Sequence, residues 1–265
     1  MTILVTGATG NIGRRVVDHL IALGATDIRA LTTDPAKAKL PESVTAVTGY
    51  LGRPETLPAA LHGVRRMYLA PLPATLPTTL ELAEQAGVEY VVALSGGAHW
   101  QQHADTIAAA PLTSTQLGPG EFLENFTLWA EQIKTTRTVR EPYPDVVEAP
   151  ISMDDIARVA AHLLAEPDPS HHGRMYELTG PQALTRARIA EQIGVGIGVD
   201  VTFRRCDRAE AERALEPVMG ARARWYLDLL ADGAPQRANR LVEELTGTPA
   251  ESVAQWATRH AELFR

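Results

Sequence analysis

Short apolar runs alternate with helical patterns over the first half of the chain. Five such runs have the length of buried strands, at residues 3–5, 28–31, 44–47, 67–69 and 90–94. After the first run, hydrophobic residues recur at helical spacing from Ile12 to Leu23 and stop at Gly24. Further helices are expected in three places: after Pro35, over residues 57–61 and over residues 80–86. Because parallel strands need crossover connections, this alternation predicts a doubly wound parallel sheet with helices on both faces.

The second half has a different pattern. Prolines interrupt shorter elements from Pro142 onward, and helices rich in Arg and Glu are expected from Asp207. Ser152, followed three residues later by Asp155 and then by an apolar face, predicts the start of another helix. We therefore predict a sheet domain over residues 1–150 and a smaller, mixed, mainly helical cap over residues 151–265, with the last sheet elements interleaved between about residues 117 and 180.

Composition narrows the class of protein. The net charge of −7 argues against nucleic acid as the main partner, because that affinity comes from clustered Lys and Arg. No run approaches the roughly 20 apolar residues of a membrane span, and no charged leader precedes Ile3. The single cysteine, Cys206, cannot form an internal disulfide and is a poor zinc ligand. We expect a cytoplasmic protein, monomeric or homodimeric, that acts on a small molecule away from membranes.

A glycine-rich segment lies directly between the first strand and the first helix. It reads Gly7-Ala8-Thr9-Gly10-Asn11-Ile12-Gly13. In this context Gly7 permits a tight turn, Gly10 lets the backbone approach a pyrophosphate, and Gly13 allows close packing of helix on strand. The free amides and the positive end of the helix dipole would then face the phosphates. The alternative is an ordinary glycine turn; the succession of strand–helix units favours dinucleotide binding.

The glycine-rich segment and several other motifs resemble those of a known family. The segment from Thr6 to Gly13 is similar to the signature of extended and atypical short-chain dehydrogenase/reductases. Further matches narrow the resemblance to the NmrA-like atypical subfamily: Arg29-Ala30-Leu31 before Asp34-Pro35, Ala60-Leu61-His62-Gly63-Val64, Leu94-Ser95, Phe122-Leu123-Glu124-Asn125, Asp155-Ile156-Ala157 and Tyr176-Glu177-Leu178-Thr179-Gly180-Pro181. That subfamily includes NAD(P)H-dependent quinone and azo reductases and redox-sensing regulators. The resemblance spans about the first 200 residues and implies a Rossmann fold that binds NAD(P)(H).

The chain departs from the wider family at the catalytic residues. The standard acid is a tyrosine with a lysine four residues later, but Lys37, Lys39 and Lys134 are preceded at that spacing by Thr33, Pro35 and Ala130. The serine that assists this pair would fall at Gly96, one position after Ser95. Relatives carry Gly-Asp where this chain has Gly49-Tyr50, so Tyr50 is expected either to stack near the adenine or to pack on the surface.

The resemblance and the strand ends together give the expected cofactor contacts. These are Gly7, Thr9, Gly10, Asn11, Ile12, Gly13, Thr32, Thr33, Lys37, Tyr50, Leu51, Ala70, Pro71, Leu72, Leu94, Ser95 and Gly96. Thr32 and Thr33 occupy the place of the carboxylate that recognises the 2′-hydroxyl of NAD. With Arg14 and Lys37 in reach, this loop favours NADP(H), and NAD(H) is the alternative.

The segment after the fifth strand carries the candidates for chemistry. His103 is the preferred proton donor or substrate anchor, with Trp100 as an apolar wall; the alternative is a solvated histidine. Phe122 is a second substrate contact, and Tyr143, between two prolines, is a candidate catalytic residue from the cap. His171-His172 suggests no metal site because no third ligand is evident.

We therefore predict an NAD(P)H-dependent oxidoreductase that reduces a hydrophobic carbonyl, quinone or related conjugated small molecule without the Tyr–Lys pair. The cofactor supplies the difficult chemistry, so a strong acid is optional for an easily reduced quinone. Two alternatives remain open: a redox sensor that binds the dinucleotide without turnover, and a non-redox enzyme, such as a cyclase or dehydratase, on the same fold.

Overall fold

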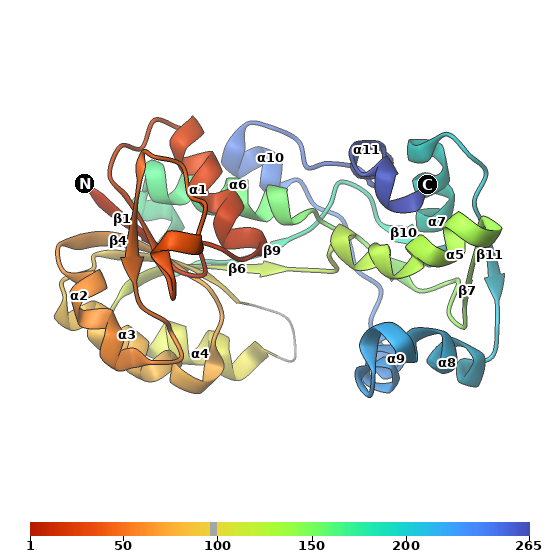
Figure 1. The fold of residues 1–265 in the computed structure, drawn as a ribbon, viewed down its shortest axis with the longest axis horizontal. Coiled ribbons are helices and arrows are strands. Elements are labelled where there is room, and N and C mark those ends of the chain that lie inside the picture. The colour runs from red at the N-terminus through yellow and green to blue at the C-terminus, as the bar shows by residue number, and fades with distance from the viewer. Residues whose placement is uncertain (96–99) are drawn as a thin grey trace. The chain divides into compact units, whose positions relative to one another are not determined.

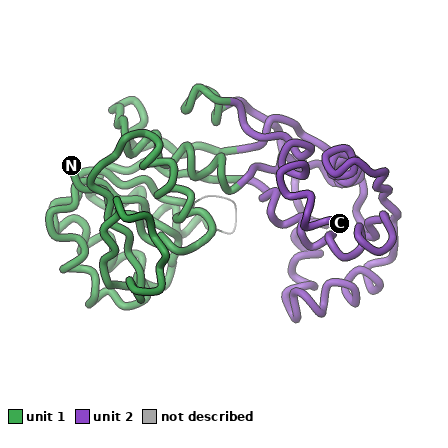
Figure 2. Tube along the Cα trace, turned by 45° about the horizontal axis from the view of Figure 1, so that its top comes forward, with its two compact units in different colours: residues 1–119, 153–178, 241–248 green, residues 120–152, 179–240, 249–265 purple. Residues whose placement is uncertain are grey.

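The computed structural model describes residues 1–95 and 100–265, which form two compact units. Figure 2 shows that each unit is built from separate stretches of chain. Unit 1 contains residues 1–119, 153–178 and 241–248, and unit 2 contains residues 120–152, 179–240 and 249–265. The boundary expected at residue 150 falls near the end of the first segment of unit 2, because the helix that begins at Met153 packs with the sheet of unit 1.

A seven-stranded sheet of parallel strands forms the centre of unit 1. The order is β3-β2-β1-β4-β5-β6-β9. The strands are β1 (Thr2–Val5), β2 (Ile28–Thr32), β3 (Val44–Thr48), β4 (Val64–Leu69), β5 (Tyr90–Leu94), β6 (Thr113–Pro119) and β9 (Met175–Leu178). The predicted doubly wound sheet is confirmed, and the strand order reverses between β1 and β4.

Helices cover both faces of this sheet (Figure 1). One face carries α1 (Asn11–Ala22), α6 (Met153–Ala165) and α10 (Leu241–Thr246), and the other carries α2 (Leu57–Leu61), α3 (Leu76–Gln85) and α4 (Gln101–Ala109). Their buried faces follow the apolar spacing of the sequence, as in α1, where Val16, Val17 and Leu20 are fully buried. The helix expected after Pro35 is only the 3₁₀ turn η1 (Pro35–Lys37), because the backbone reaches a positive φ of 46° at Lys39.

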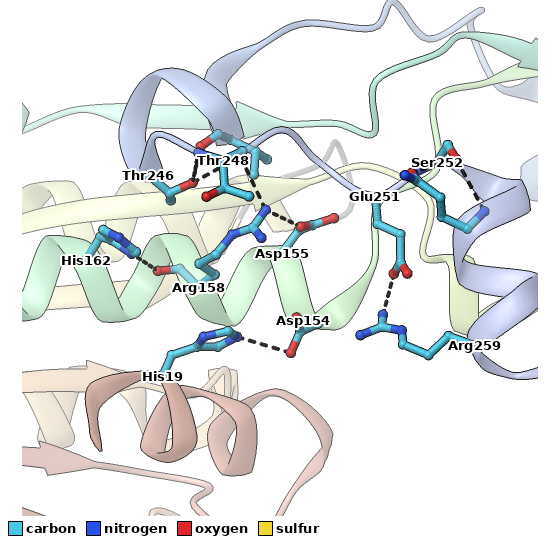
Figure 3. Close-up of polar contacts among 12 residues, drawn as sticks. His19, Asp154, Asp155, Arg158, His162, Thr246, Thr248, Glu251, Ser252 and Arg259 are labelled. Carbon is cyan, nitrogen blue, oxygen red and sulfur yellow. Dashed lines mark hydrogen bonds and ion pairs between the residues drawn. The ribbon is translucent and has the colours of Figure 1, made fainter. Parts of the chain in front are cut away.

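Polar contacts fasten α6 to its neighbours within unit 1 (Figure 3). His19 Nε2 on α1 lies 3.1 Å from Asp154 Oδ1. Arg158 donates to Asp155 Oδ1 at 2.5 Å and to the carbonyl oxygen of Thr248 at 3.4 Å, which ties α6 to the segment after α10. Helix α6 follows the first segment of unit 2 in the sequence, and these contacts hold it on the sheet that the first half of the chain forms.

Unit 2 is mixed and mainly helical, as expected. Its strands pair in two small sheets, β7 (Thr138–Glu141) with β11 (Thr202–Arg205) and β8 (Val147–Glu148) with β10 (Leu184–Thr185). Its helices are η5 (Leu123–Trp129), α5 (Ala130–Thr136), α7 (Arg186–Ile197), α8 (Arg208–Met219), α9 (Arg222–Asp232), α11 (Val253–Arg259) and η7 (Ala261–Phe264). Trp129 and Trp256 lie in its larger core, and α8 and α9 enclose a smaller one.

A buried arginine joins these elements of unit 2. Arg186, at the start of α7, is fully buried and donates to Glu141 Oε2 at 2.8 Å, Glu148 Oε2 at 2.7 Å and the Tyr226 hydroxyl at 2.8 Å. Its guanidinium also lies 4.9 Å from the ring centroid of Trp129. The hydrogen bonds and the aromatic ring compensate for the loss of hydration of the charge.

Candidate functional site

The loops that follow β1 to β4, together with Ser95 directly after β5, lie at one edge of the sheet of unit 1. The carboxyl ends of parallel strands meet there, and ligands of open α/β sheets bind where the strand order reverses. In this unit the reversal separates β1 from β4. Thr6 joins the two strands: its hydroxyl donates to the Tyr68 carbonyl at 2.9 Å and accepts from the Ala70 amide at 2.8 Å. The predicted contacts after β1 and β4 are thus brought together.

The glycine loop has the close packing that its sequence predicts. Gly7 has a φ of +59°, and a Cβ there would lie 2.9 Å from Ala70 Cβ. A Cβ on Gly13 would lie only 2.2 Å from the Gly7 carbonyl oxygen, so the first turn of α1 rests directly on the loop. Gly10 is different, because its φ of −86° suits any residue and a Cβ would lie 3.2 Å from the Gly7 oxygen. Because Gly10 has no side chain, the loop leaves room for a ligand at this position; the glycine is not needed to relieve backbone strain.

This loop presents backbone and short polar side chains. Gly7, Thr9, Gly10 and Asn11 are exposed, whereas Ile12 turns into the core. Gly10 supplies no side-chain cap, and the first turn of α1 carries no acidic residue. The first amides of a helix have no partner within it, and they lie at the positive end of its dipole. A pyrophosphate therefore fits this cradle in both shape and charge.

The end of β2 holds the residues expected near the ribose. Thr32 is buried and its hydroxyl accepts from the Asp34 amide at 3.3 Å, while Thr33 is exposed. Lys37 is 86% exposed and lies 3.1 Å from Asp34 Oδ2. Arg14, expected to be in reach of a phosphate, donates to the Lys39 carbonyl at 2.9 Å instead. Lys37 is thus an exposed cation of this loop that an added phosphate could approach.

The loop after β3 places its two predicted contacts differently. Tyr50 is 48% exposed, and its ring lies over Gly52, where a Cβ would be 2.4 Å from Tyr50 Cε1. Leu51 is buried in the core of unit 1, so only its backbone is available to a ligand. Tyr50 thus offers an exposed aromatic ring, while the Leu51 side chain serves packing.

His103 is buried, contrary to the solvated alternative. It lies in the first turn of α4 with 4% exposure, and its Nδ1 is 3.2 Å from the hydroxyl of Ser95, which follows β5. Among the residues that the structure describes, His103 Nε2 has no hydrogen-bond partner. Burial lowers the pKa of His103, which favours the neutral form of the imidazole.

A cavity of about 190 Å³ lies beside this histidine, within unit 1. Its walls come from the loop and helix after β4 and from the start of α4, namely Pro73, Leu76, Pro77, Trp100, Gln102, His103 and Thr106. The Trp100 ring is 38% exposed and stands edge-on to the imidazole, with the centroids 5.5 Å apart. These side chains are apolar or carry an amide, hydroxyl or imidazole group, and none of these residues is an Asp, Glu, Lys or Arg.

The remaining candidates make contacts within their own units. Phe122 forms a bridge with Ile151 in unit 2, and the Tyr143 hydroxyl there accepts from Arg208 at 3.4 Å. His171 pairs with the Tyr176 hydroxyl at 2.7 Å. Over residues 1–95 and 100–265, no cluster of three metal-ligating side chains occurs. Gly96 lies outside the described residues.

The pairing of Ser95 with His103 was missing from the sequence-based prediction. Each residue was a candidate for a different reason, and the sequence between them has no hydrophobic periodicity from which their pairing could be predicted. The sequence does indicate that two residues of the cavity wall lie together, because His103 and Thr106 stand three residues apart in α4 and so share a helix face. Both residues line the cavity.

Both the sequence and the fold are similar to those of known proteins. The sequence model of the NAD(P)H-binding family matches residues 7–167. A (4-alkanoyl-5-oxo-2,5-dihydrofuran-3-yl)methyl phosphate reductase from Streptomyces griseus is 29% identical over 99% of both chains. An NAD(P)H azoreductase from Xenophilus azovorans is also 29% identical over 99% of both chains. The structure of an NADPH-dependent quinone oxidoreductase from Escherichia coli in complex with NADPH is similar with a TM-score of 0.82 and 25% identity, covering 98% of this chain and 100% of that one.

Proposed function

The chain belongs to the NAD(P)H-binding family, and we propose that it is an NADPH-dependent reductase of a quinone, azo compound or related conjugated acceptor. The observation that carries this proposal is the cradle at Gly7–Gly13, open to a pyrophosphate at the reversal of strand order. Three similar proteins, each matched over nearly its whole length, are a furanone phosphate reductase, an azoreductase and a quinone oxidoreductase. They support reduction of a conjugated small molecule.

The absence of a Tyr–Lys pair in the sequence fits such acceptors. When bound, the nicotinamide supplies a hydride, which carries both electrons. A quinone that takes up this hydride and one proton from water becomes a hydroquinone, and its first product is already a stabilised phenolate. The protein then needs to orient the acceptor, not to supply a strong acid.

We assign the roles of the residues as follows. The Gly7–Gly13 loop holds the pyrophosphate, Thr33 and Lys37 receive the 2′-phosphate of NADPH, and the exposed ring of Tyr50 lies along the adenine. His103 anchors the acceptor by hydrogen bonding, since its lowered pKa disfavours the imidazolium that general acid catalysis would use.

The cellular setting completes the proposal. Among the described residues, none of the helices is long and apolar enough to cross a membrane. With the net charge of −7, we propose a cytoplasmic enzyme acting on a small molecule, as a monomer or homodimer and without nucleic acid. Phe122 remains a predicted substrate contact, and Tyr143 remains a predicted catalytic residue.

Oxidation of NADPH and NADH with a panel of quinones and azo compounds tests the proposal, with calorimetric titration of both cofactors in parallel. We expect tight NADPH binding and turnover with at least one conjugated acceptor. Binding without turnover across the panel would overturn the reductase and favour a dinucleotide sensor. Conversion of a substrate without net cofactor oxidation would favour a non-redox enzyme.

A further inference from the structure

A largely buried cluster in unit 2 holds three carboxyl groups around one guanidinium. Glu141 lies in β7, Glu148 lies in β8, and Glu121 lies two residues before η5. Arg186 on α7 is a cation that faces all three carboxyls, and it donates to the Tyr226 hydroxyl of α9 at 2.8 Å. If every carboxyl were ionised, three negative charges would face this positive charge in a place with little water. Burial therefore favours a proton on one of the three.

The hydrogen bonds indicate that Glu121 is the carboxyl that keeps the proton. Glu141 and Glu148 each accept from the Arg186 guanidinium, at 2.8 and 2.7 Å. Within the described residues, the hydrogen bond found for the Glu121 carboxyl comes from the neutral Asn125 amide, at 3.0 Å. A charged donor stabilises a carboxylate more than a neutral amide does. In agreement, burial and the charge of Glu148 raise the pKa of Glu121 to about 7.

The backbone at Glu121 is paired with one residue of the same unit. The Glu121 carbonyl accepts from the Ile151 amide at 2.9 Å, and the Leu123 amide donates to the Ile151 carbonyl at 2.9 Å. Glu121 is partly exposed, so its side chain borders on water. An ionised carboxylate regains in water the hydration that the cluster denies it. Ionisation therefore favours an outward turn of Glu121, which breaks the bond from Asn125 at the start of η5.

We propose that Glu121 is a pH-sensitive switch of unit 2. Protonated, it stays in the cluster with Glu148 and Arg186; ionised, it turns outward and loosens the pairing of residues 121–123 with Ile151. The switched segment includes Phe122, which forms a bridge with Ile151. The inference concerns the conformation of unit 2 and does not depend on the proposed reductase function.

The groups that face Glu121 determine the direction of the switch. They are Glu148 from β8, Glu141 from β7, Arg186 from α7 and Tyr226 from α9. The pKa values of Arg186 and Tyr226 are raised, by the carboxylates for the arginine and by burial for the tyrosine, so both keep their protons at neutral pH. The pKa of Glu121 is raised in the inward form, so that form loses stability as pH rises from 4.5 to about 7, and the loss is complete above that range.

Carbon-13 NMR of the glutamate carboxyls measures the proton directly. We expect the Glu121 carboxyl, assigned through bonds from its backbone, to titrate close to neutral pH. Titration near the ordinary value of 4.5 would overturn the switch. This measurement needs no variant, so it decides the proposal even if a substitution at Glu121 prevents folding.

Hydrogen exchange of the Leu123 and Ile151 amides measures the loosening. Between pH 5 and pH 8, after correction for the ordinary effect of pH on exchange, their opening should increase by more than about tenfold, because ionisation favours the outward form. The Thr202 amide, which donates to the Arg137 carbonyl at 3.0 Å in the same unit, is the control and should not respond. No increase, or an equal increase at all three amides, would overturn the switch.

Two variants separate the charge of Glu121 from its shape. Glu121→Gln has nearly the same shape without the ionisable group, so its Leu123 and Ile151 amides should lose their pH dependence. Glu131→Gln removes an exposed carboxyl from α5 of the same unit and should behave as wild type. A pH dependence that persists in Glu121→Gln, or that disappears in Glu131→Gln, assigns the response to other groups and overturns the proposal.

Discussion

Replacing Gly10 by aspartate changes helix stability and anion binding in opposite directions. Gly10 is the N-cap of α1 with φ −86° and ψ 175°, which is the ordinary extended geometry of that position. An added Cβ meets only the Gly7 carbonyl oxygen, at 3.2 Å, so a shift of a few tenths of an ångström accommodates it. Asp is a preferred N-cap residue, and its carboxylate accepts from the same first-turn amides that we assign to the pyrophosphate.

The magnitudes follow from these positions. Asp in place of Gly at an N-cap gains a few tenths of a kcal/mol, and its charge at the helix start adds about 0.3–1 kcal/mol. Against a bound pyrophosphate, a carboxylate about 5 Å from one phosphate charge costs about 3 kcal/mol at an effective dielectric constant of about 20. NADPH affinity should therefore fall by more than about 100-fold, while the folded protein is as stable as wild type or slightly more so.

Calorimetric titration with NADPH and urea unfolding measure the two effects. Gly10→Asn is the matched control, because it has nearly the same shape and capping ability without the charge. We expect Gly10→Asn to bind NADPH with an affinity between those of wild type and Gly10→Asp. A Gly10→Asp variant that is folded and binds NADPH as tightly as wild type would show that the pyrophosphate does not lie on this loop.

Three further outcomes are expected. Wild type should bind NADPH at least as tightly as NADH in the same titration. Thr33→Asp should shift the preference toward NADH, because it places a like charge near the 2′-phosphate. A wild-type preference for NADH of about tenfold would contradict this. Burial and the charge of Glu148 raise the pKa of Glu121 from 4.5 to about 7. As pH rises from 4.5 to 7, the free energy of unfolding of wild type should therefore fall by up to about 3 kcal/mol relative to that of Glu121→Gln, as measured by urea unfolding at each pH. A pH-independent difference between the two proteins would refute the shift. Tyr226→Phe removes an acceptor of buried Arg186 and should lower the free energy of unfolding by about 2 kcal/mol; no loss would mean that water replaces the hydroxyl.

The apolar pattern located the first five strands well because each is a short hydrophobic run between turns. The run at residues 28–31 becomes β2 (Ile28–Thr32), and the run at residues 90–94 becomes β5 without change at either end. The glycine loop was also predictable, since only glycine tolerates the approach between Gly13 and the Gly7 carbonyl. In these places local sequence and tertiary packing demand the same residues.

Strand β6 could not be located in this way. It reads Thr-Ser-Thr-Gln-Leu-Gly-Pro, yet its middle is buried. The polar side chains are accepted because the Tyr90 hydroxyl pairs with Thr115 Oγ1 at 2.7 Å and Gln116 donates to the Ala104 carbonyl at 3.1 Å. These partners come from β5 and α4, so the burial depends on contacts that no pattern within the strand encodes.

The environment of His103 was hidden for a similar reason. Its neighbours Gln101 and Gln102 give the segment a polar pattern typical of a solvated helix start. The imidazole is buried because α4 lies against the sheet, where Ser95 meets Nδ1. The partner of His103 depends on the fold, because Ser95 and His103 are brought together only when α4 packs on the sheet.

Transfer of a labelled hydride tests the reductase most directly. Wild type is mixed without oxygen with naphthoquinone and NADPH carrying deuterium at the transferable position of the nicotinamide ring, and cofactor oxidation and hydroquinone formation are followed together. The account predicts one hydroquinone for each NADPH consumed and slower single-turnover oxidation of the deuterated cofactor, because the bond to that hydrogen breaks in the reaction. NADPH that binds but is not consumed, or hydroquinone formed without matching loss of NADPH, would contradict it.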